Sequence, residues 1–128
     1  MGAPLELNYS RASRTLTLRF AAERYELSAE LLRVLSPSAE VRGHSSEQAK
    51  LQTGKKNVAI TQIVPTGNYG VRLVFDDGHD TGIYSWDYLE DLGRNRDRLW
   101  QDYLAELKAA GATREPLIAR QFDPRQPS

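Results

Sequence analysis

The chain has 128 residues, of which 40% are hydrophobic and 27% are charged, a composition typical of one globular domain with a buried core. Its 17 basic and 17 acidic residues give a formal net charge of +0, so no overall charge attracts it to nucleic acid or to an anionic membrane. The absence of cysteine excludes disulfides, thiolate zinc sites, iron–sulfur ligation and cysteine nucleophiles. We expect a cytoplasmic protein, because the sequence shows neither a signal peptide nor an apolar run of membrane-spanning length.

The first third of the chain predicts an antiparallel sheet followed by a short helix. Hydrophobic and polar residues alternate over 5–10 and again over 15–20, as in half-buried strands, and residues 11–13 form the turn between them. A third short strand is expected over 25–27. Ser28 can cap the helix that follows, which we expect to reach Leu35 and to stop at Pro37.

Residues 36–57 are small and polar and follow neither the helical nor the strand period. Loops longer than about 12 to 15 residues are uncommon in compact domains, and many of those that exist are functional. We interpret this stretch as a candidate binding surface. A surface loop without a function is the alternative.

The middle of the chain predicts a second set of antiparallel strands. Alternating hydrophobic residues indicate strands over 58–64 and 71–75, with a turn at 66–68. Asp77-Gly78 then predicts a two-residue hairpin loop, because a type I′ turn needs positive φ at both central positions. The partner strand is expected over 79–84. In that register Asp76 lies opposite His79, where its carboxylate can hold the imidazole.

Two helices are predicted next. Ser85 can cap a short helix over 86–92 that Gly93 closes, and Asn95 can cap an amphipathic helix that ends at Gly111. The expected fold class is therefore α+β, with antiparallel hairpins packed against about three helices in one small domain. The domain is expected over 1–112, with a mobile C-terminal tail over 113–128 that is rich in Pro, Gln and Arg.

The densest polar cluster lies at residues 76–80, where three carboxylates flank one imidazole and in principle suit a divalent cation. Adjacent strand residues point to opposite faces, so turn chemistry is the favoured interpretation. Two histidines, His44 and His79, are too few and too irregularly spaced for an oxygenase iron site. The sequence also lacks a Gly-x-Ser-x-Gly nucleophile motif and a phosphate-binding loop. We expect neither enzyme activity nor a cofactor.

Residues 32–44 (LRVLSPSAEVRGH) and 75–89 (FDDGHDTGIYSWDYL) resemble the gamma-butyrobetaine hydroxylase-like N-terminal domain family, in particular its stand-alone bacterial members. In the full-length hydroxylases this domain precedes a 2-oxoglutarate oxygenase domain, which we expect to be lacking here, and binds a structural zinc through three Cys and one His. The resemblance places these ligands at Ser36, Ser38, Val41 and His79. Because serine and valine do not replace thiolates on zinc, we expect the family's zinc site to be lost.

The resemblance implies a fold without implying hydroxylation. Our leading hypothesis is a non-catalytic accessory or protein-interaction domain that binds an unknown protein partner, and neither nucleic acid nor membrane. We expect its contacts to come from residues 36–57 and the adjoining hairpin at 76–80. The side chains proposed to contact the partner are Arg33, Arg42, His44, Tyr84 and Trp86. The alternatives are that Trp86 belongs to the core and that Arg33 pairs with Glu30 or Asp87.

A hypothesis of a different class is a metal-binding module or an oxidoreductase-associated subunit. The family's domain also occurs fused to P-loop ATPases that carry iron–sulfur clusters, which implies a recruitment role there. In this second hypothesis His79, Asp76 and His44 hold a divalent metal. It predicts bound metal that is lost in His79→Ala.

Overall fold

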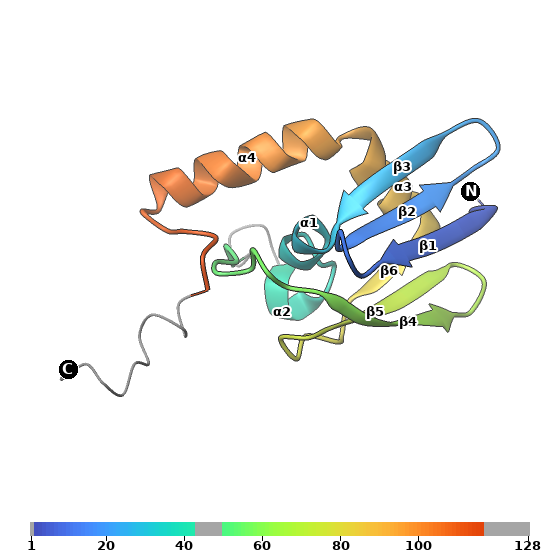
Figure 1. Cartoon of the computed structure of the whole chain (residues 1–128), viewed down its shortest axis with the longest axis horizontal. Helices are drawn as coiled ribbons and strands as arrows, with labels where there is room; N and C mark the ends of the chain where they lie inside the picture. The colour runs from blue at the N-terminus through green and yellow to red at the C-terminus, as the bar shows by residue number, and fades with distance from the viewer. Residues whose placement is uncertain (1, 43–49, 117–128) are drawn as a thin grey trace.

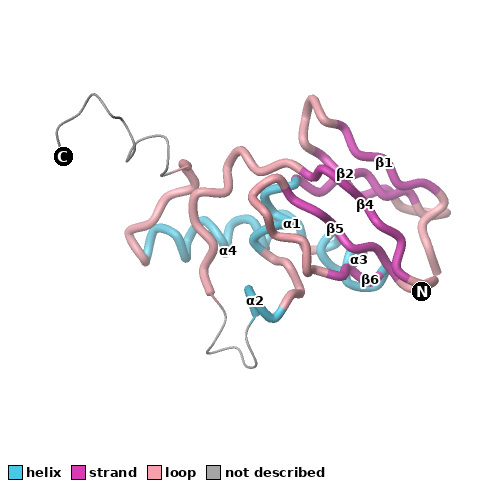
Figure 2. Tube along the Cα trace, turned by 90° about the horizontal axis from the view of Figure 1, so that it is seen from below, coloured by secondary structure: helices cyan, strands magenta, loops and turns pink. Residues whose placement is uncertain are grey.

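The computed structural model describes residues 2–42 and 50–116 (Figure 1). They form two three-stranded antiparallel sheets and four helices, an α+β arrangement that confirms the expected class. Figures 1 and 2 both place the six strands at one end of the molecule and the longest helix, α4, along the other.

The first sheet has the order β1 (Glu6–Ser10), β2 (Thr15–Arg19), β3 (Arg24–Ser28). Its register puts Leu7 opposite Leu18 and Leu16 opposite Leu27, so the alternating apolar residues share one face. Leu16, Leu18 and Leu27 are fully buried. The three strands and the connecting turn confirm the predicted pattern.

The second sheet has the order β4 (Ile60–Thr66), β5 (Gly70–Phe75), β6 (Ile83–Ser85). The predicted two-residue loop between β5 and its partner is wrong. The Phe75 N–H donates to the His79 carbonyl at 2.9 Å and the Gly78 N–H donates to the Phe75 carbonyl at 3.2 Å, which leaves a three-residue loop at 76–78. Positive φ is needed at Gly78 alone (92°), as in a type I turn followed by a bulge. Residues 79–82 therefore run outside the strand, and β6 is much shorter than the expected 79–84.

Helix α1 (Ala29–Val34) begins where the sequence predicts, because the Ser28 hydroxyl accepts a hydrogen bond from the Leu31 N–H at 3.0 Å. Helix α2 (Ala39–Arg42) lies inside the stretch that we expected to have no regular structure, so that prediction was wrong there. A four-residue helix is too short to show a hydrophobic period. The Ser38 hydroxyl accepts from the Glu40 N–H at its start.

Helix α3 (Trp86–Arg94) is capped by Ser85 as predicted, but Gly93 lies inside it instead of closing it. A Cβ at Gly93 would lie 2.4 Å from Cγ of Tyr25, so the glycine allows α3 to approach β3. Helix α4 (Arg96–Ala109) follows directly. The expected Asn95 side-chain cap is absent, because the Asn95 amide donates to the Asp91 carbonyl at 2.9 Å.

One hydrophobic cluster joins both sheets and three of the helices. Its buried members are Leu16, Leu18, Leu27, Ala29, Leu31, Leu32, Val34, Val58, Ile60, Val71, Leu73, Phe75, Tyr84, Leu89, Leu92, Tyr103 and Leu107. The sheets also meet through a polar contact, in which the Tyr9 hydroxyl of β1 accepts from the Ile60 N–H of β4 at 3.0 Å. Among residues 2–42 and 50–116, no helix has the length and apolar character needed to cross a membrane.

Residues 113–116, which we expected to begin the mobile tail, pack against the domain. The Gly54 N–H donates to the Thr113 carbonyl at 2.9 Å, and the Lys56 N–H donates to the Arg114 carbonyl at 3.0 Å. Residues 117–128 of the expected tail lie outside the described residues.

Candidate functional site

The segment joining α1 to α2 contacts the segment between β5 and β6. The Ser36 hydroxyl lies 2.8 Å from Nε2 of His79, and the Ser38 hydroxyl lies 2.6 Å from that of Thr81. Gly82 permits this approach, since a Cβ there would lie 2.4 Å from Oγ of Ser36. The two segments that we expected to adjoin therefore do so, through one buried and one partly buried polar contact.

These contacts form at the positions where the resemblance places the family's zinc ligands. Ser36, Ser38, Val41 and His79 are all buried, with at most 7% of each residue exposed. Hydroxyl groups and a valine do not provide the soft anionic ligands that zinc requires, so this set does not fit the metal. Hydrogen bonds between Ser36 and His79 and between Ser38 and Thr81 instead connect the two segments directly.

Of the alternative metal set, the structure describes Asp76 and His79, and these two side chains have different partners. The Asp76 carboxylate accepts from the Ala59 N–H at 3.1 Å, toward β4, and the revised turn places Phe75 rather than Asp76 opposite His79. His44 lies outside the described residues. Within 2–42 and 50–116, no group of three or more histidine or carboxylate side chains is placed to hold a metal ion.

Both nitrogens of the His79 ring have polar neighbours. Nδ1 lies 3.2 Å from the Glu40 carboxylate, and Nε2 faces Ser36. Burial lowers the pKa of His79 below its usual 6.5, Arg33 lowers it further, and Glu40 opposes the shift. The ring is therefore neutral at pH 7. Because a carboxylate only accepts, Nδ1 donates to Glu40, and Nε2 accepts from the Ser36 hydroxyl.

Ser36, His79 and Glu40 thus have the hydrogen-bond order of a serine–histidine–acid triad. Sequence reasoning did not nominate Glu40, because its position depends on α2, which the hydrophobic pattern does not reveal. Ser36 has no exposed surface, so a substrate carbonyl cannot reach its hydroxyl. Ser36 and His79 do not line any of five surface clefts formed by the described residues.

Arg33 forms an ion pair with Asp77 inside the fold. Its Nε donates to the Asp77 carboxylate at 2.8 Å, and Lys55 donates to the same oxygen. Burial by itself would raise the pKa of Asp77, but hydrogen bonds from Lys55, from the His79 N–H and from Arg33 outweigh it and lower that pKa from 3.8 to about 2. Arg33 is 7% exposed, so it is not the surface contact that we expected. Its Nη1 is buried and has no hydrogen-bond partner among the described residues.

The prediction that Tyr84 contacts a partner is also wrong, because Tyr84 has no exposed surface and its hydroxyl donates to the Leu32 carbonyl. Trp86 is half-buried, and its indole N–H donates to the Asn68 carbonyl at 3.0 Å in the β4–β5 turn. Of the expected contacts that the structure describes, Arg42 is exposed. Its Nη2 donates to the Tyr88 hydroxyl at 2.6 Å, which holds the guanidinium beside the ring.

Arg42 lies on the rim of a groove of about 620 Å³ between α1, α2 and α4. The groove is lined by Val34, Leu35, Val41, Arg42, Lys50, Leu51, Gln52, Leu99, Asp102, Tyr103, Glu106, Ala109 and Ala110. Sequence reasoning missed the contribution of α4. The sequence predicted an amphipathic helix here but not a groove beside it, and the structure divides the apolar residues of α4 between the core and this groove.

Comparison with known proteins identifies a family model, gamma-butyrobetaine hydroxylase-like, N-terminal, that matches residues 7–90. This range includes β1 except Glu6, β2 to β6 and the first half of α3, together with all four family zinc positions named above. The search of curated proteins found no match.

Three solved structures resemble the chain along most of its length. Two are NMR solution structures of proteins with 51% and 50% sequence identity and TM-scores of 0.81 and 0.78. The first match covers 91% of this chain and 92% of the other, and the second covers 100% and 93%. The third is a 1.93 Å crystal structure of a protein of unknown function of the DUF971 family from Acidithiobacillus ferrooxidans ATCC 23270. It has 37% identity and a TM-score of 0.60, and the match covers 70% of this chain and 91% of that one. The chain therefore belongs to the gamma-butyrobetaine hydroxylase-like N-terminal family.

Proposed function

We propose that the chain is a non-catalytic protein-interaction domain that binds a helix of a partner protein in the groove between α1, α2 and α4. The observation that carries the proposal is an apolar groove with rims of opposite charge. Arg42 and Lys50 lie on one side, and Asp102 and Glu106 lie on α4. The cytoplasmic location expected from the sequence is part of the same proposal.

The walls of the groove are held in place by hydrogen bonds. The Lys50 N–H donates to the Val41 carbonyl at 2.8 Å, and the Tyr103 hydroxyl donates to the Gln52 carbonyl at 2.8 Å. Leu51 stands between these two contacts with 36% of its surface exposed. A preformed apolar groove binds with a smaller entropic cost than one that must order on binding.

The charged rims select the occupant. A helix that inserts an apolar stripe into a groove presents polar side chains on both flanks of that stripe. Here an acidic flank would face Arg42 and Lys50, and a basic flank would face Asp102 and Glu106. The proposed partner segment is therefore an amphipathic helix with charges of opposite sign on its two flanks.

Photo-crosslinking in the native host tests the groove. A crosslinking amino acid at Leu51 is expected to capture a protein through a helical segment with this charge pattern, and the same group at Tyr69, in the β4–β5 turn, is the matched control. Both residues are exposed, at 36% and 56%. The same product from both positions would contradict the groove as the binding site.

A charge-reversal experiment makes the test specific. The captured segment is made as a synthetic peptide, and the charge is reversed first on the groove and then on the peptide. Arg42→Glu is expected to weaken peptide binding about 10-fold or more in calorimetry, since a rim charge pair becomes repulsive. Replacing the facing acidic residue of the peptide with lysine should restore the affinity for Arg42→Glu. Arg19→Glu on β2 is the control and should bind as the wild type does. Unchanged affinity in Arg42→Glu would exclude the proposed orientation.

The absence of catalysis is part of the proposal, and it is supported by the burial of Ser36. A fluorophosphonate probe, which reacts with activated serines, is expected to leave the protein unlabelled. Labelling that disappears in Ser36→Ala would show a serine nucleophile and overturn the non-catalytic assignment.

We also propose that the domain works without a resident metal, because the family's ligand positions hold Ser36, Ser38 and Val41. Elemental analysis of protein purified without chelator is expected to find no stoichiometric zinc or iron. Stoichiometric metal that is lost in His79→Ala would revive the metal-binding hypothesis.

A further inference from the structure

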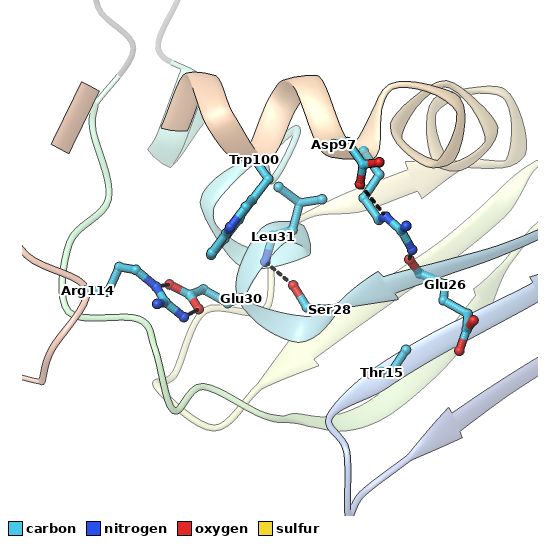
Figure 3. A pocket seen from close by; sticks show the side chains of 9 residues that line it. Thr15, Glu26, Ser28, Glu30, Leu31, Asp97, Trp100 and Arg114 are labelled. Atoms are coloured by element: carbon cyan, nitrogen blue, oxygen red, sulfur yellow. Dashed lines mark hydrogen bonds and ion pairs between the residues drawn. The ribbon is translucent and has the colours of Figure 1, made fainter. Parts of the chain in front are cut away.

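A second cleft, of about 460 Å³, lies between β3, the start of α1, and α4 (Figure 3). It is lined by Thr15, Glu26, Ser28, Glu30, Leu31, Arg96, Asp97, Trp100 and Arg114. None of these residues lines the groove of the proposed function, so the two sites can be tested independently.

One wall of this cleft holds the guanidinium of Arg114. Its Nε donates to one carboxylate oxygen of Glu30 at 2.8 Å, and its Nη2 donates to the other at 2.7 Å. The guanidinium carbon also lies 4.9 Å from the centre of the Trp100 ring. Figure 3 shows the Glu30 carboxylate facing the guanidinium, with Trp100 beside the pair.

This arrangement is selective for a guanidinium group. The two parallel hydrogen bonds need a planar fork of donors, which an ammonium group lacks, and a flat guanidinium can in addition stack on the aromatic ring. Glu30 is 6% exposed, although it carries a charge. A carboxylate buried to this degree requires a cationic partner.

The partner of Glu30 comes from a distant segment, 84 residues later in the chain. Residues 113–116, which we name the strap, are held by the backbone bonds from Gly54 and Lys56 and by an exposed ion pair between Lys56 and Glu115 at 3.0 Å. The cation that pairs with Glu30 therefore comes from the strap, and not from β3, α1 or α4, which form the cleft.

The charge around the cleft favours a second cation when the strap is absent. The lining contains three carboxylates, from Glu26, Glu30 and Asp97, and two guanidinium groups, from Arg96 and Arg114. Arg96 is occupied, because its guanidinium donates to the Glu26 carbonyl at 3.0 Å and contacts Asp97 at 3.2 Å. Without Arg114, Glu30 would lose its cation, while Asp97 would keep Arg96 and Glu26 would keep its ion pair with Arg24 at 3.7 Å.

We propose that Glu30 and Trp100 form a binding site for an arginine side chain, which Arg114 fills within the chain and which an arginine of a partner peptide occupies when the strap leaves. The interaction is an exchange of one guanidinium for another on the same carboxylate. It concerns a surface different from the proposed helix groove.

Arg114→Ala tests the site by chemical complementation, in a Trp86→Phe background that leaves Trp100 as the fluorescent residue. Ethylguanidinium and N-acetyl-arginine amide are expected to give a saturable change in Trp100 fluorescence. Ethylammonium at the same concentrations should give none. The wild-type strap should weaken the response at least 10-fold, and adding Glu30→Gln to Arg114→Ala should abolish it.

Three results would overturn the proposal: equal responses to ethylguanidinium and ethylammonium, equal binding to wild type and Arg114→Ala, or binding that survives Glu30→Gln.

Should Arg114→Ala fail to fold, the intact protein provides the test through the Arg114 Nε–H signal in nitrogen-15 NMR. We expect slow exchange and an upfield shift from the Trp100 ring, and loss of the signal in Arg114→Lys. A signal at the position of a solvent-exposed arginine would exclude the site.

Discussion

Asp77 links three parts of the chain through one carboxylate. Arg33 comes from α1, Lys55 from the segment before β4, and the backbone N–H of His79 from the residue after the 76–78 loop, of which Asp77 is the middle residue. With 20% of its side chain exposed, Asp77 is shielded enough for these partners to lower its pKa to about 2. The sequence indicated a turn residue here, and the tertiary contacts made it an ionic centre.

The lowered pKa of Asp77 predicts how the free energy of unfolding changes with pH. The folded pKa of Asp77 lies below its unfolded value of 3.8, so its contribution is present above pH 3.8 and is lost as the pH falls toward about 2. At about 1.4 kcal/mol per pH unit, and reduced by solvent screening at this partly exposed carboxylate, the contribution is on the order of 1–2 kcal/mol. In urea unfolding measured from pH 7 to pH 2, Asp77→Asn should be less stable at pH 7 and should lose less stability below pH 4. Asp80→Asn, in an exposed position of the same segment, is the control. An acid profile of Asp77→Asn identical to that of the wild type would contradict the ion pair.

At the scale of elements, the contact between α3 and β3 depends on Gly93. An alanine there has a better helix propensity by about 1 kcal/mol, which by itself would stabilise α3. Its Cβ would lie 2.4 Å from Cγ and 2.7 Å from Cβ of Tyr25, atoms too close to the backbone to move away easily. Because overpacking costs about 1–3 kcal/mol, the clash outweighs the propensity.

Gly93→Ala should therefore lower the free energy of unfolding by about 1 kcal/mol or more in urea titration. Gly2→Ala is the control, since a Cβ there meets nothing within 4 Å. A stability equal to or above that of the wild type would show that α3 and β3 separate without cost.

The contact between the α1–α2 and β5–β6 segments brings together the positions of the family's zinc ligands. Placing cysteine at three of these positions should therefore create a zinc site. If the resemblance assigns the zinc positions correctly, the triple variant Ser36→Cys, Ser38→Cys, Val41→Cys should bind one zinc ion with His79 as the fourth ligand. Zinc should raise its melting temperature and leave that of the wild type unchanged, because metal that binds the folded state stabilises it. Cobalt substitution would report thiolate ligands by absorption. A triple variant without metal binding, or one whose binding survives a further His79→Ala change, would disprove the assignment.

At the scale of the whole molecule, the two sheets share one core. Tyr84 of β6 has no exposed surface and its hydroxyl donates to the Leu32 carbonyl of α1, while Tyr9 of β1 accepts from Ile60 of β4. The apolar faces of both sheets are buried in this one cluster, so neither sheet keeps a buried face without the other. We therefore expect the sheets to unfold together.

Thermal transitions followed by far-ultraviolet circular dichroism and by tryptophan fluorescence should coincide. Tyr84→Ala should destabilise both by about 3–5 kcal/mol through cavity formation, and Tyr84→Phe by about 1–2 kcal/mol through the unpaired Leu32 carbonyl. Two separated transitions, or a loss confined to one signal, would show that the sheets are independent units.

Local patterns in the sequence determined five of the six strands and the starts of α1, α3 and α4. Alternation defined β1 to β5, and Ser28 and Ser85 cap α1 and α3 as predicted, because strand period and capping depend on neighbouring residues alone. The family resemblance, carried by residues 32–44 and 75–89, was confirmed by the matching family model.

The tertiary structure decided the roles of the polar side chains. Arg33 and Tyr84 became parts of the interior, Glu40 and Ser36 came to flank His79, and Arg114 reached Glu30 across 84 residues. Each of these outcomes depends on which segments pack together, because the partner of a buried charge lies far away in the chain. The length of the β5–β6 loop was decided in the same way. Three residues at 76–78 allow Asp77 to meet Arg33 and Lys55, while the local Asp-Gly signal alone favoured two.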